Sequence, residues 1–254
     1  MILFPQDSLI EITRVIAYLG FGVFLFYLEY TGKFNLPYSK FAENKGVSPK
    51  IGMFLVYFLP ILGYLSTQDH LTNLSPFQKL TLITFCFHFA KRCLEVLFLH
   101  KFSGKMGITG VVLITIAYTN IGLICGRNHN LMNSDYTDKI PSLQIYLAIT
   151  LFFIGQFGNF FHHVLLRKLR NQTNRTSYVV PEGGMFSILV CPHYFFELLS
   201  WFAYSLLSTH WETYLLFFLM SCYLTGRSHQ TKLWYKAHIP AFPTERKRIW
   251  PYLF

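Results

Sequence analysis

Apolar stretches of helix length, separated by short polar segments, run through the whole chain. A helix needs roughly 20 apolar residues to cross about 30 Å of hydrocarbon, and about seven stretches reach or approach that length. They lie at 9–29, 51–66, 78–100, 106–125, 143–166, 187–208 and 211–226. The pattern predicts an all-α fold, a polytopic membrane bundle of about seven transmembrane helices.

The composition agrees with a membrane protein. The 254 residues are 52% hydrophobic and only 13% charged, about half the charged fraction of a typical soluble domain. No linker, internal repeat or low-complexity tract divides the sequence, so we predict one membrane-embedded domain over residues 1–254. The first apolar segment carries Glu11 and Arg14 at its start and lacks the basic head and cleavage site of a signal peptide, so we expect it to remain as a helix.

The five cysteines lie in or at the ends of apolar segments, without the spacing of metal ligands. A free cysteine commonly behaves as a small buried residue. We therefore expect packing roles for them, and we predict neither a metal site nor a nucleic-acid partner.

The lysines and arginines predict the orientation in the membrane, because positive charge is retained on the cytosolic side. Sixteen of the 22 fall in four segments, 30–50, 101–105, 167–186 and 227–254. The loops between the other helix ends carry three. We predict a lumenal N-terminus and a cytosolic C-terminus.

Polar side chains at helical spacing interrupt four of the predicted spans near the cytosolic side. They are His88, Lys91, Arg92 and Glu95 in the third span, Asn159, His163 and Arg167 in the fifth, His193 and Glu197 in the sixth, and Arg227 after the seventh. A charge at the centre of a membrane costs at least roughly 2.5 to 3.5 kcal/mol unless it is paired or faces water. Because four helices place such groups at the same depth, we predict a ligand site there.

Structural roles for the same groups stay open. Lys91 and Arg92 can pair with Glu95 as a cluster that holds helices together, as polar groups do in membranes. The basic residues at 167–170 can be anchors at a helix end on the cytosolic side.

The sequence PEGG at 181–184 offers a rigid proline followed by glycines, which let a backbone turn sharply or approach a ligand closely. A cationic pocket with amide and aromatic groups suits a soluble, phosphate-rich molecule, because arginine binds phosphate in a bidentate manner. An adjoining membrane-facing cavity suits a lipid. Since the chain has neither a GxGxxG sequence after a strand nor a Walker sequence, a dinucleotide would be held without a Rossmann fold.

Five separate motifs resemble the steroid 5α-reductase family, whose relatives include the very-long-chain trans-2-enoyl-CoA reductases. They are HFAKRCLEVLFLHKFSGKM at 88–106, GQFGNFFHHVLLRKLR at 155–170, YVVPEGGMFSILVCPHYFFELLSW at 178–201, GRSHQTKLWY at 226–235 and FPTERKRIWPYLF at 242–254. The similarity is strongest over residues 80–254 and is closest to the plant members and the enoyl-CoA branch. It implies a seven-helix enzyme of the endoplasmic reticulum that uses NADPH to reduce a carbon–carbon double bond conjugated to a carbonyl group, with a 3-oxo-Δ4-steroid as the first substrate.

Carried over position by position, the resemblance also implies contacts to NADPH. These are made by Lys91, Arg92, Asn159, His163, Arg170, Tyr178, His193, Glu197, Arg227, Tyr235 and Arg246. The steroid branch usually has Asn at the position of His193 and an acid at the position of His163. It holds the steroid ketone with a Glu and a Tyr, where this chain has the segment 56–58 and Phe89.

Reduction of an enone requires a hydride at the β carbon, a hydrogen-bond donor to the carbonyl oxygen and a proton at the α carbon. A neutral tyrosine hydroxyl can donate without carrying charge into the membrane. We expect Tyr194 to be this donor, with Tyr57 second and Glu197 organising the pocket; a packing role for Tyr194 is the alternative. Two other functions stay open, a trans-2-enoyl-CoA reductase of fatty-acid elongation and a non-catalytic sterol-binding membrane protein.

Overall fold

The computed structural model describes residues 2–4, 8–34, 36, 45–68, 71, 73–102, 104–132, 139–172 and 179–254. Its α-helices are α1 (Leu9–Thr31), α2 (Pro49–Leu65), α3 (Pro76–Leu94), α4 (Ile108–Asn130), α6 (Ser142–Gln172), α7 (Pro192–Ser208) and α8 (Trp211–His238). A π-helical turn, Glu95–Leu99, continues α3, and a 3-10 turn, Gly184–Ser187, precedes α7. The described residues contain no strand, so the prediction of an all-α fold is confirmed.

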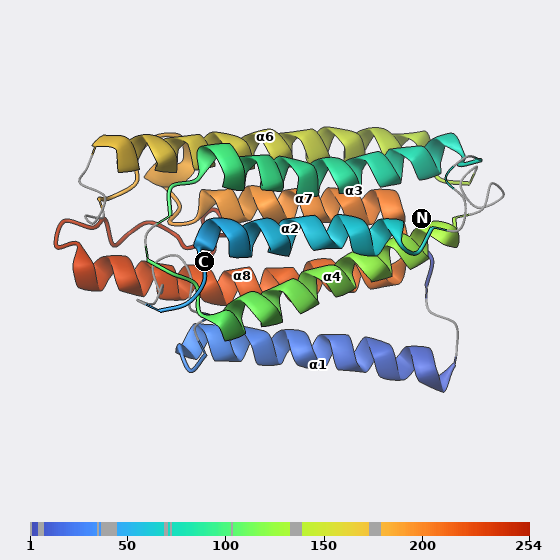
Figure 1. Cartoon of the computed structure of the whole chain (residues 1–254), viewed down its shortest axis with the longest axis horizontal. Coiled ribbons are helices and arrows are strands. Elements are labelled where there is room, and N and C mark those ends of the chain that lie inside the picture. The colour runs from blue at the N-terminus through green and yellow to red at the C-terminus, as the bar shows by residue number, and fades with distance from the viewer. Residues whose placement is uncertain are drawn as a thin grey trace.

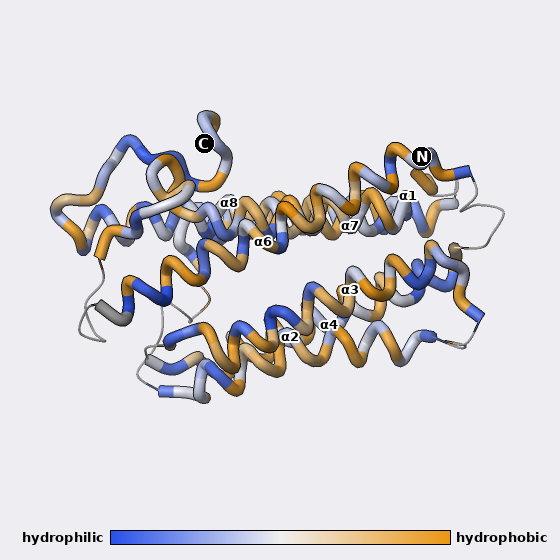
Figure 2. The backbone as a smooth tube through the Cα atoms, turned by 90° about the horizontal axis from the view of Figure 1, so that it is seen from above, coloured by the Kyte–Doolittle hydropathy of each residue, from blue (hydrophilic) through white to orange (hydrophobic). Residues whose placement is uncertain are grey.

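The helices form two layers (Figure 2). One layer contains α6, α7, α8 and α1, in which each helix packs against the next, and the other contains α3, α2 and α4 with α2 in the middle. A hydrophobic core that includes Phe85, Phe89, Trp201 and Tyr204 fills the space between α3 and α7. The layers therefore enclose an interior that side chains from every helix can reach.

The helices run alternately in opposite directions along the long axis of the bundle (Figure 1). At one end, which we call the basic end, α1, α3, α6 and α8 finish and α2, α4 and α7 begin. The segments that border these helix ends hold sixteen lysines and arginines, of which the structure describes all but Lys40 and Arg175. Among the described residues, the excess positive charge thus gathers toward a single end of the bundle.

Local sequence explains several helix ends. The hydroxyl of Ser8 accepts the amide N–H of Glu11 at the start of α1, and Ser75 with Gln78 forms a capping box at the start of α3. Proline stands in the first turn of α2, α3 and α7, where its missing N–H leaves no intrahelical bond unmade. Gly32, with φ of 72°, ends α1 in the left-handed conformation.

Glycines allow the closest helix contacts. A Cβ atom at Gly122 of α4 would lie 2.2 Å from the carbonyl oxygen of Pro60 in α2, and one at Gly155 of α6 would lie 2.4 Å from the hydroxyl of Ser200 in α7. Small residues at such crossings let backbones approach, which is how helices associate in membranes.

Four predicted boundaries were wrong by five residues or more. The sixth helix begins at Pro192 rather than 187, because residues 184–187 form the 3-10 turn and Leu189 pairs with the backbone of Lys247. The fourth continues to Asn130 rather than 125, the fifth to Gln172 rather than 166 and the seventh to His238 rather than 226. The apolar pattern stops earlier because the last turns of these three helices are rich in polar residues.

Three of the helices, α1, α4 and α6, are long and apolar enough to cross a membrane by length and composition. The shorter α2 is also apolar over its 17 residues. The remaining helices, α3, α7 and α8, carry the polar groups described next and lie beside these four in the same bundle (Figure 1).

Candidate active site

A charged network lies where α3 ends and is centred on Glu95. One carboxylate oxygen of Glu95 lies 2.6 Å from Nη1 of Arg92 and 3.0 Å from Nδ1 of His163, and the other lies 3.1 Å from Nζ of Lys91. Nη2 of Arg92 donates to the hydroxyl of Tyr57 at 2.6 Å. Glu95 and Arg92 are almost completely buried, so their charges are compensated by one another rather than by water.

The network continues from α3 to α6 and α7 through Asn159. Its side-chain oxygen accepts a hydrogen bond from Nζ of Lys91 at 2.6 Å, and its side-chain nitrogen donates to the backbone oxygen of His193 at 2.9 Å. One amide thereby fixes the relative positions of three helices at the basic end.

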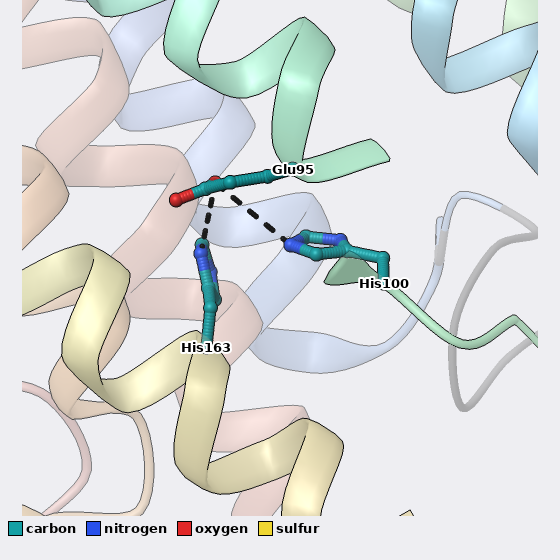
Figure 3. A group of neighbouring side chains, drawn as sticks. All are labelled: Glu95, His100 and His163. Atoms are coloured by element: carbon teal, nitrogen blue, oxygen red, sulfur yellow. Dashed lines mark hydrogen bonds and ion pairs between the residues drawn. The ribbon is translucent and has the colours of Figure 1, made fainter. Parts of the chain in front are cut away.

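Figure 3 shows that His163 of α6 and His100, which follows the π-helical turn, both face the same carboxylate oxygen of Glu95. Ligand atoms of these three residues lie within 4.8 Å of one another, a spacing that a metal ion can use. Lys91 and Arg92, however, already contact both carboxylate oxygens, and Nη1 of Arg92 lies 3.1 Å from Nδ1 of His163. Because a divalent cation would be placed against two fixed positive charges, we interpret the group as an ion-pair network.

The first turns of α7 present His193, Tyr194 and Glu197 on the side that faces α3 and α6. The ring of His193 lies 4.4 Å from that of Tyr194 and 5.5 Å from that of His163, measured between centroids. Glu197 pairs with His88 of α3, whose Nε2 lies 3.2 Å from a carboxylate oxygen. The polar side chains that the sequence places at helical spacing on α3, α6 and α7 therefore lie close together.

Arg227 of α8 lies deeper in the bundle. Its guanidinium is 1% exposed, is 3.4 Å from the carboxylate of Glu29 in α1, and donates to the backbone oxygen of Leu36 at 3.0 Å. Tyr235, two turns further along α8, stacks on Phe242 with a centroid distance of 5.0 Å. The sequence had not predicted the partnership with Glu29.

The PEGG segment folds over the basic end. Gly183 and Gly184 have φ of 87° and 52°, values at which a side chain would be strained. The N–H of Met185 donates to Nε2 of His162 at 3.1 Å, and Nη1 of Arg246 donates to the backbone oxygen of Pro181 at 2.6 Å. Two buried side chains from different parts of the chain thus hold this loop in place.

A cavity of about 1130 Å³ connects these groups. Ten of the thirteen predicted site residues line it: Tyr57, Arg92, Asn159, His163, Arg170, His193, Tyr194, Glu197, Arg227 and Tyr235. Lys91 does not line the cavity but contacts Asn159, which does, and Arg246 contacts Pro181 in the loop. Tyr178 lies outside the described residues. The prediction that these groups share one site is supported by geometry, while their roles stay predictions.

The rest of the cavity wall is largely apolar. It is formed by side chains of α1, α4 and α8, among them Leu25, Leu28, Ile114, Ile121 and Met220. The part of the wall at the basic end is cationic and includes Lys101, Arg167 and Arg170. Nη1 of Arg170 donates to the backbone oxygen of Lys101. The cavity is therefore cationic at the basic end and apolar further in, an arrangement that fits one phosphorylated and one lipidic molecule.

Four residues that shape the site were not predicted as members of it: Glu29, His88, Gln156 and His162. An unpaired acid in a first span indicates a distant cation, but only the fold shows that it is Arg227. His88 belongs to the polar stripe of α3, which was a usable signal. Gln156 and His162 lie one turn or less from Asn159 on α6, so helical spacing could have found them.

Comparison with known proteins identifies relatives over most of the chain. A family model described as 3-oxo-5-alpha-steroid 4-dehydrogenase matches residues 105–254. A very-long-chain enoyl-CoA reductase of Dictyostelium discoideum is 30% identical over 229 residues, which cover 82% of this chain and 73% of that protein. A steroid 5-alpha-reductase of Gossypium hirsutum is 25% identical over 256 residues, covering 96% and 95%. A shorter match, 35% identical, covers 51% of this chain and 43% of a protein of Trypanosoma brucei brucei, so the chain spans less than half of that relative.

Proposed function

We propose, since the chain belongs to the 3-oxo-5-alpha-steroid 4-dehydrogenase family, that it uses NADPH to reduce a carbon–carbon double bond conjugated to a carbonyl group in a lipid. The family identifies an oxidoreductase acting on CH–CH groups, and the resemblance seen in the sequence is thereby confirmed. The observation that carries the finer proposal is one cavity of about 1130 Å³, which is cationic at the basic end and mainly apolar beyond it, apart from Arg14, which pairs with Glu212. It exceeds the roughly 300 to 1,000 Å³ of a site for one small molecule.

The cationic part of the cavity fits NADPH. Arg170 of α6 and Arg227 of α8 offer guanidinium groups, and Asn159 and His163 of α6 add polar side chains to the wall of the same cavity. Guanidinium groups bind phosphate oxygens with charge-assisted, bidentate hydrogen bonds. Tyr235 lines the same region, while Arg246 supports the site by holding Pro181 in the loop that covers it. When bound, NADPH supplies the hydride for the β carbon of the substrate.

A tyrosine would donate to the carbonyl oxygen of the lipid. Tyr57 and Tyr194 both line the cavity, and Arg92 donates a hydrogen bond to the Tyr57 hydroxyl at 2.6 Å. This contact draws electron density from the hydroxyl oxygen and makes its O–H a better donor to a developing oxyanion. We therefore place Tyr57 before Tyr194 as the donor, which reverses the order expected from the sequence.

Two substrate classes deserve testing. The first is a 3-oxo-Δ4-steroid, which agrees with the whole-chain similarity to a plant steroid 5-alpha-reductase. The second is a trans-2-enoyl-CoA thioester, favoured by the higher identity to a very-long-chain enoyl-CoA reductase. Val56 and Phe89 are completely buried apolar residues in the region where the steroid branch has its ketone-binding pair. Tyr57, with Arg92 behind it, would take the place of that pair.

The deciding experiment supplies membranes containing the protein with NADPH and two panels, 3-oxo-Δ4-steroids and 2-enoyl-CoA thioesters of several chain lengths. We expect reduction of one panel by the wild type and loss of that reduction in Arg170→Ala at low NADPH. Membranes from cells without the protein are the control. Reduction of neither panel would favour the third function, a sterol-binding protein without catalysis.

We also propose that residues 1–254 act as one reductase unit in the endoplasmic reticulum membrane, with a lumenal N-terminus and a cytosolic basic end. The gathering of the basic segments at one end of the bundle supports this orientation. Protease added to sealed microsomes should remove a C-terminal tag and spare an N-terminal one. The reverse pattern would contradict cytosolic access for the cofactor.

A further inference from the structure

His88 and Gln156 form a buried pair behind Glu197 that the proposed reaction does not yet use. Nε2 of Gln156 donates to Nδ1 of His88 at 2.8 Å, and Nε2 of His88 lies 3.2 Å from the carboxylate of Glu197. The three residues come from α6, α3 and α7 and are 2%, 4% and 8% exposed. Side chains from three helices are thus joined in one line that ends at the cavity.

The orientation of the Gln156 amide favours one tautomer of His88. With the amide nitrogen facing Nδ1, a neutral imidazole that accepts its N–H carries the ring proton on Nε2. That is the nitrogen facing Glu197. The imidazole ring is held on its other sides by Trp201, with ring centroids 5.4 Å apart, and by Phe89 at 5.0 Å. His88 therefore places Nε2 3.2 Å from the carboxylate, although the present alignment falls short of a hydrogen bond.

Glu197 has a carboxylate with two different surroundings. One oxygen faces His88, and the residue also lines the cavity beside His193 and Tyr194. Nε2 of His88, at 3.2 Å, is the side-chain atom that forms an ion-pair contact with this carboxylate in the described part of the chain. With one oxygen held from behind, the other can accept a hydrogen bond from a molecule in the cavity.

We propose that Gln156 and His88 are positioning residues, which act through Glu197 to hold its carboxylate as a hydrogen-bond acceptor for a cofactor that would bind in the cavity. The proposal rests on the proposed function, because it assumes that NADPH binds in this cavity. A carboxylate that accepts from an amide N–H or a sugar hydroxyl orients the ligand, and orientation is a large part of the rate that such a site supplies. The chemical group recognised is a hydrogen-bond donor of the cofactor.

The test compares two substitutions of His88. His88→Leu removes the donor but keeps an apolar group of similar size, whereas His88→Gln keeps an N–H that can reach Glu197. We expect the Kd for NADPH, measured by its fluorescence with purified protein in detergent, to rise roughly 10- to 100-fold in His88→Leu, as expected for a lost charge-assisted hydrogen bond. His88→Gln should stay within about threefold of wild type, because its amide can still donate to the carboxylate.

Double variants with Glu197 show whether His88 acts by positioning that carboxylate or only by supporting the fold. If His88 acts through that carboxylate, then His88→Leu combined with Glu197→Gln should bind NADPH no more weakly than Glu197→Gln alone. Gln156→Leu should weaken binding by about 3- to 10-fold, since it removes the neutral hydrogen bond that fixes the imidazole. Thr84→Val, which changes a neighbour of His88 whose hydroxyl bonds only to the backbone of its own helix, should bind as wild type does.

The outcomes can be told apart. Wild-type protein that binds no NADPH would overturn the proposed function itself. Wild-type binding together with unchanged binding in both His88→Leu and Gln156→Leu would overturn the positioning role, as would losses in His88→Leu and Glu197→Gln that simply add. If His88→Leu does not fold, Gln156→Leu and the Gln156→Leu, Glu197→Gln double variant give the same comparison.

Discussion

The two ends of the bundle hold their helices together in different ways. At the basic end, Glu95 is surrounded by Lys91, Arg92 and His163 in a buried ionic network that also borders the cavity. At the opposite end, the hydroxyl of Tyr64 in α2 lies 2.5 Å from Nδ1 of His129 in α4, a neutral pair that the cavity does not reach. The network joins α3 to α6 of the other layer and to α2 of its own, whereas the neutral pair joins α2 and α4 within one layer.

A neutral pair fixes helices without creating a strong field, whereas an ionic network does both. Removing one member of a buried ionic network leaves the other charges uncompensated in a medium of low dielectric constant. Removing one member of a neutral pair leaves only an unpaired polar group. We infer that the Glu95 network carries charge because the site beside it needs a field, and that the Tyr64–His129 pair contributes stability alone. The opposite end as a whole is not neutral, because Arg14 forms an ion pair with Glu212 there.

The largest effect is expected for Glu95→Leu. The substitution leaves Lys91 and Arg92 without their shared carboxylate, and breaking a buried pair of this kind costs about 3 to 5 kcal/mol. Thermal unfolding in detergent should show a greatly lowered midpoint, with loss of all reductase activity. Glu182→Leu, which changes an exposed acid in the nearby loop, is the matched control and should unfold as wild type does. Equal stability of the two variants would contradict the ionic interpretation.

Tyr57→Phe should have the next largest effect, and it acts on rate rather than on stability. It keeps the ring but removes the hydroxyl held by Arg92, and one positioned donor commonly supplies roughly 10² to 10⁴ in rate. Steady-state kcat on whichever panel the wild type reduces is the measurement. Tyr194→Phe tests the competing assignment in parallel. If Tyr194→Phe alone loses turnover, the donor is the one first expected from the sequence.

A smaller effect is expected for Arg170→Ala. Arg170 lines the cavity at the basic end, and a charge-assisted contact to a phosphate is worth roughly 1.5 to 3 kcal/mol. The KM for NADPH should therefore rise, while the KM for the lipid stays unchanged. Lys168→Ala removes an exposed positive charge two residues away and serves as the control for long-range attraction. A similar rise in both variants would return Arg170 to the role of a membrane anchor.

Much of this arrangement follows from local spacing. Lys91, Arg92 and Glu95 are three and four residues apart on one helix, so their pairing could be predicted directly. The alternating directions of α3, α6 and α7 predicted that their polar side chains lie at the same end of the bundle.

Contacts between distant parts of the chain could not be read in this way. Glu29 and Arg227 are separated by 198 positions, and only the packing of α1 on α8 makes them partners. The end of α8 was missed for a related reason: its last turns are too polar for a span, yet Tyr235 packs on Phe242 there. Hydropathy identifies the part of a helix that is apolar enough to contact lipid. It does not identify polar turns that pack against the rest of the protein.

The smallest effect should come from Tyr64→Phe at the opposite end. The change removes one hydroxyl and leaves Nδ1 of the buried His129 without its neutral partner, at a cost of about 1 kcal/mol. We expect a small decrease in the unfolding midpoint in detergent and an unchanged kcat and KM for NADPH, because Tyr64 does not line the cavity. The contrast with Tyr57→Phe is direct, since both tyrosines belong to α2 and lose the same atom. A loss of turnover in Tyr64→Phe would mean that this pair is coupled to the site, and the division between a charged functional network and a neutral structural pair would fail.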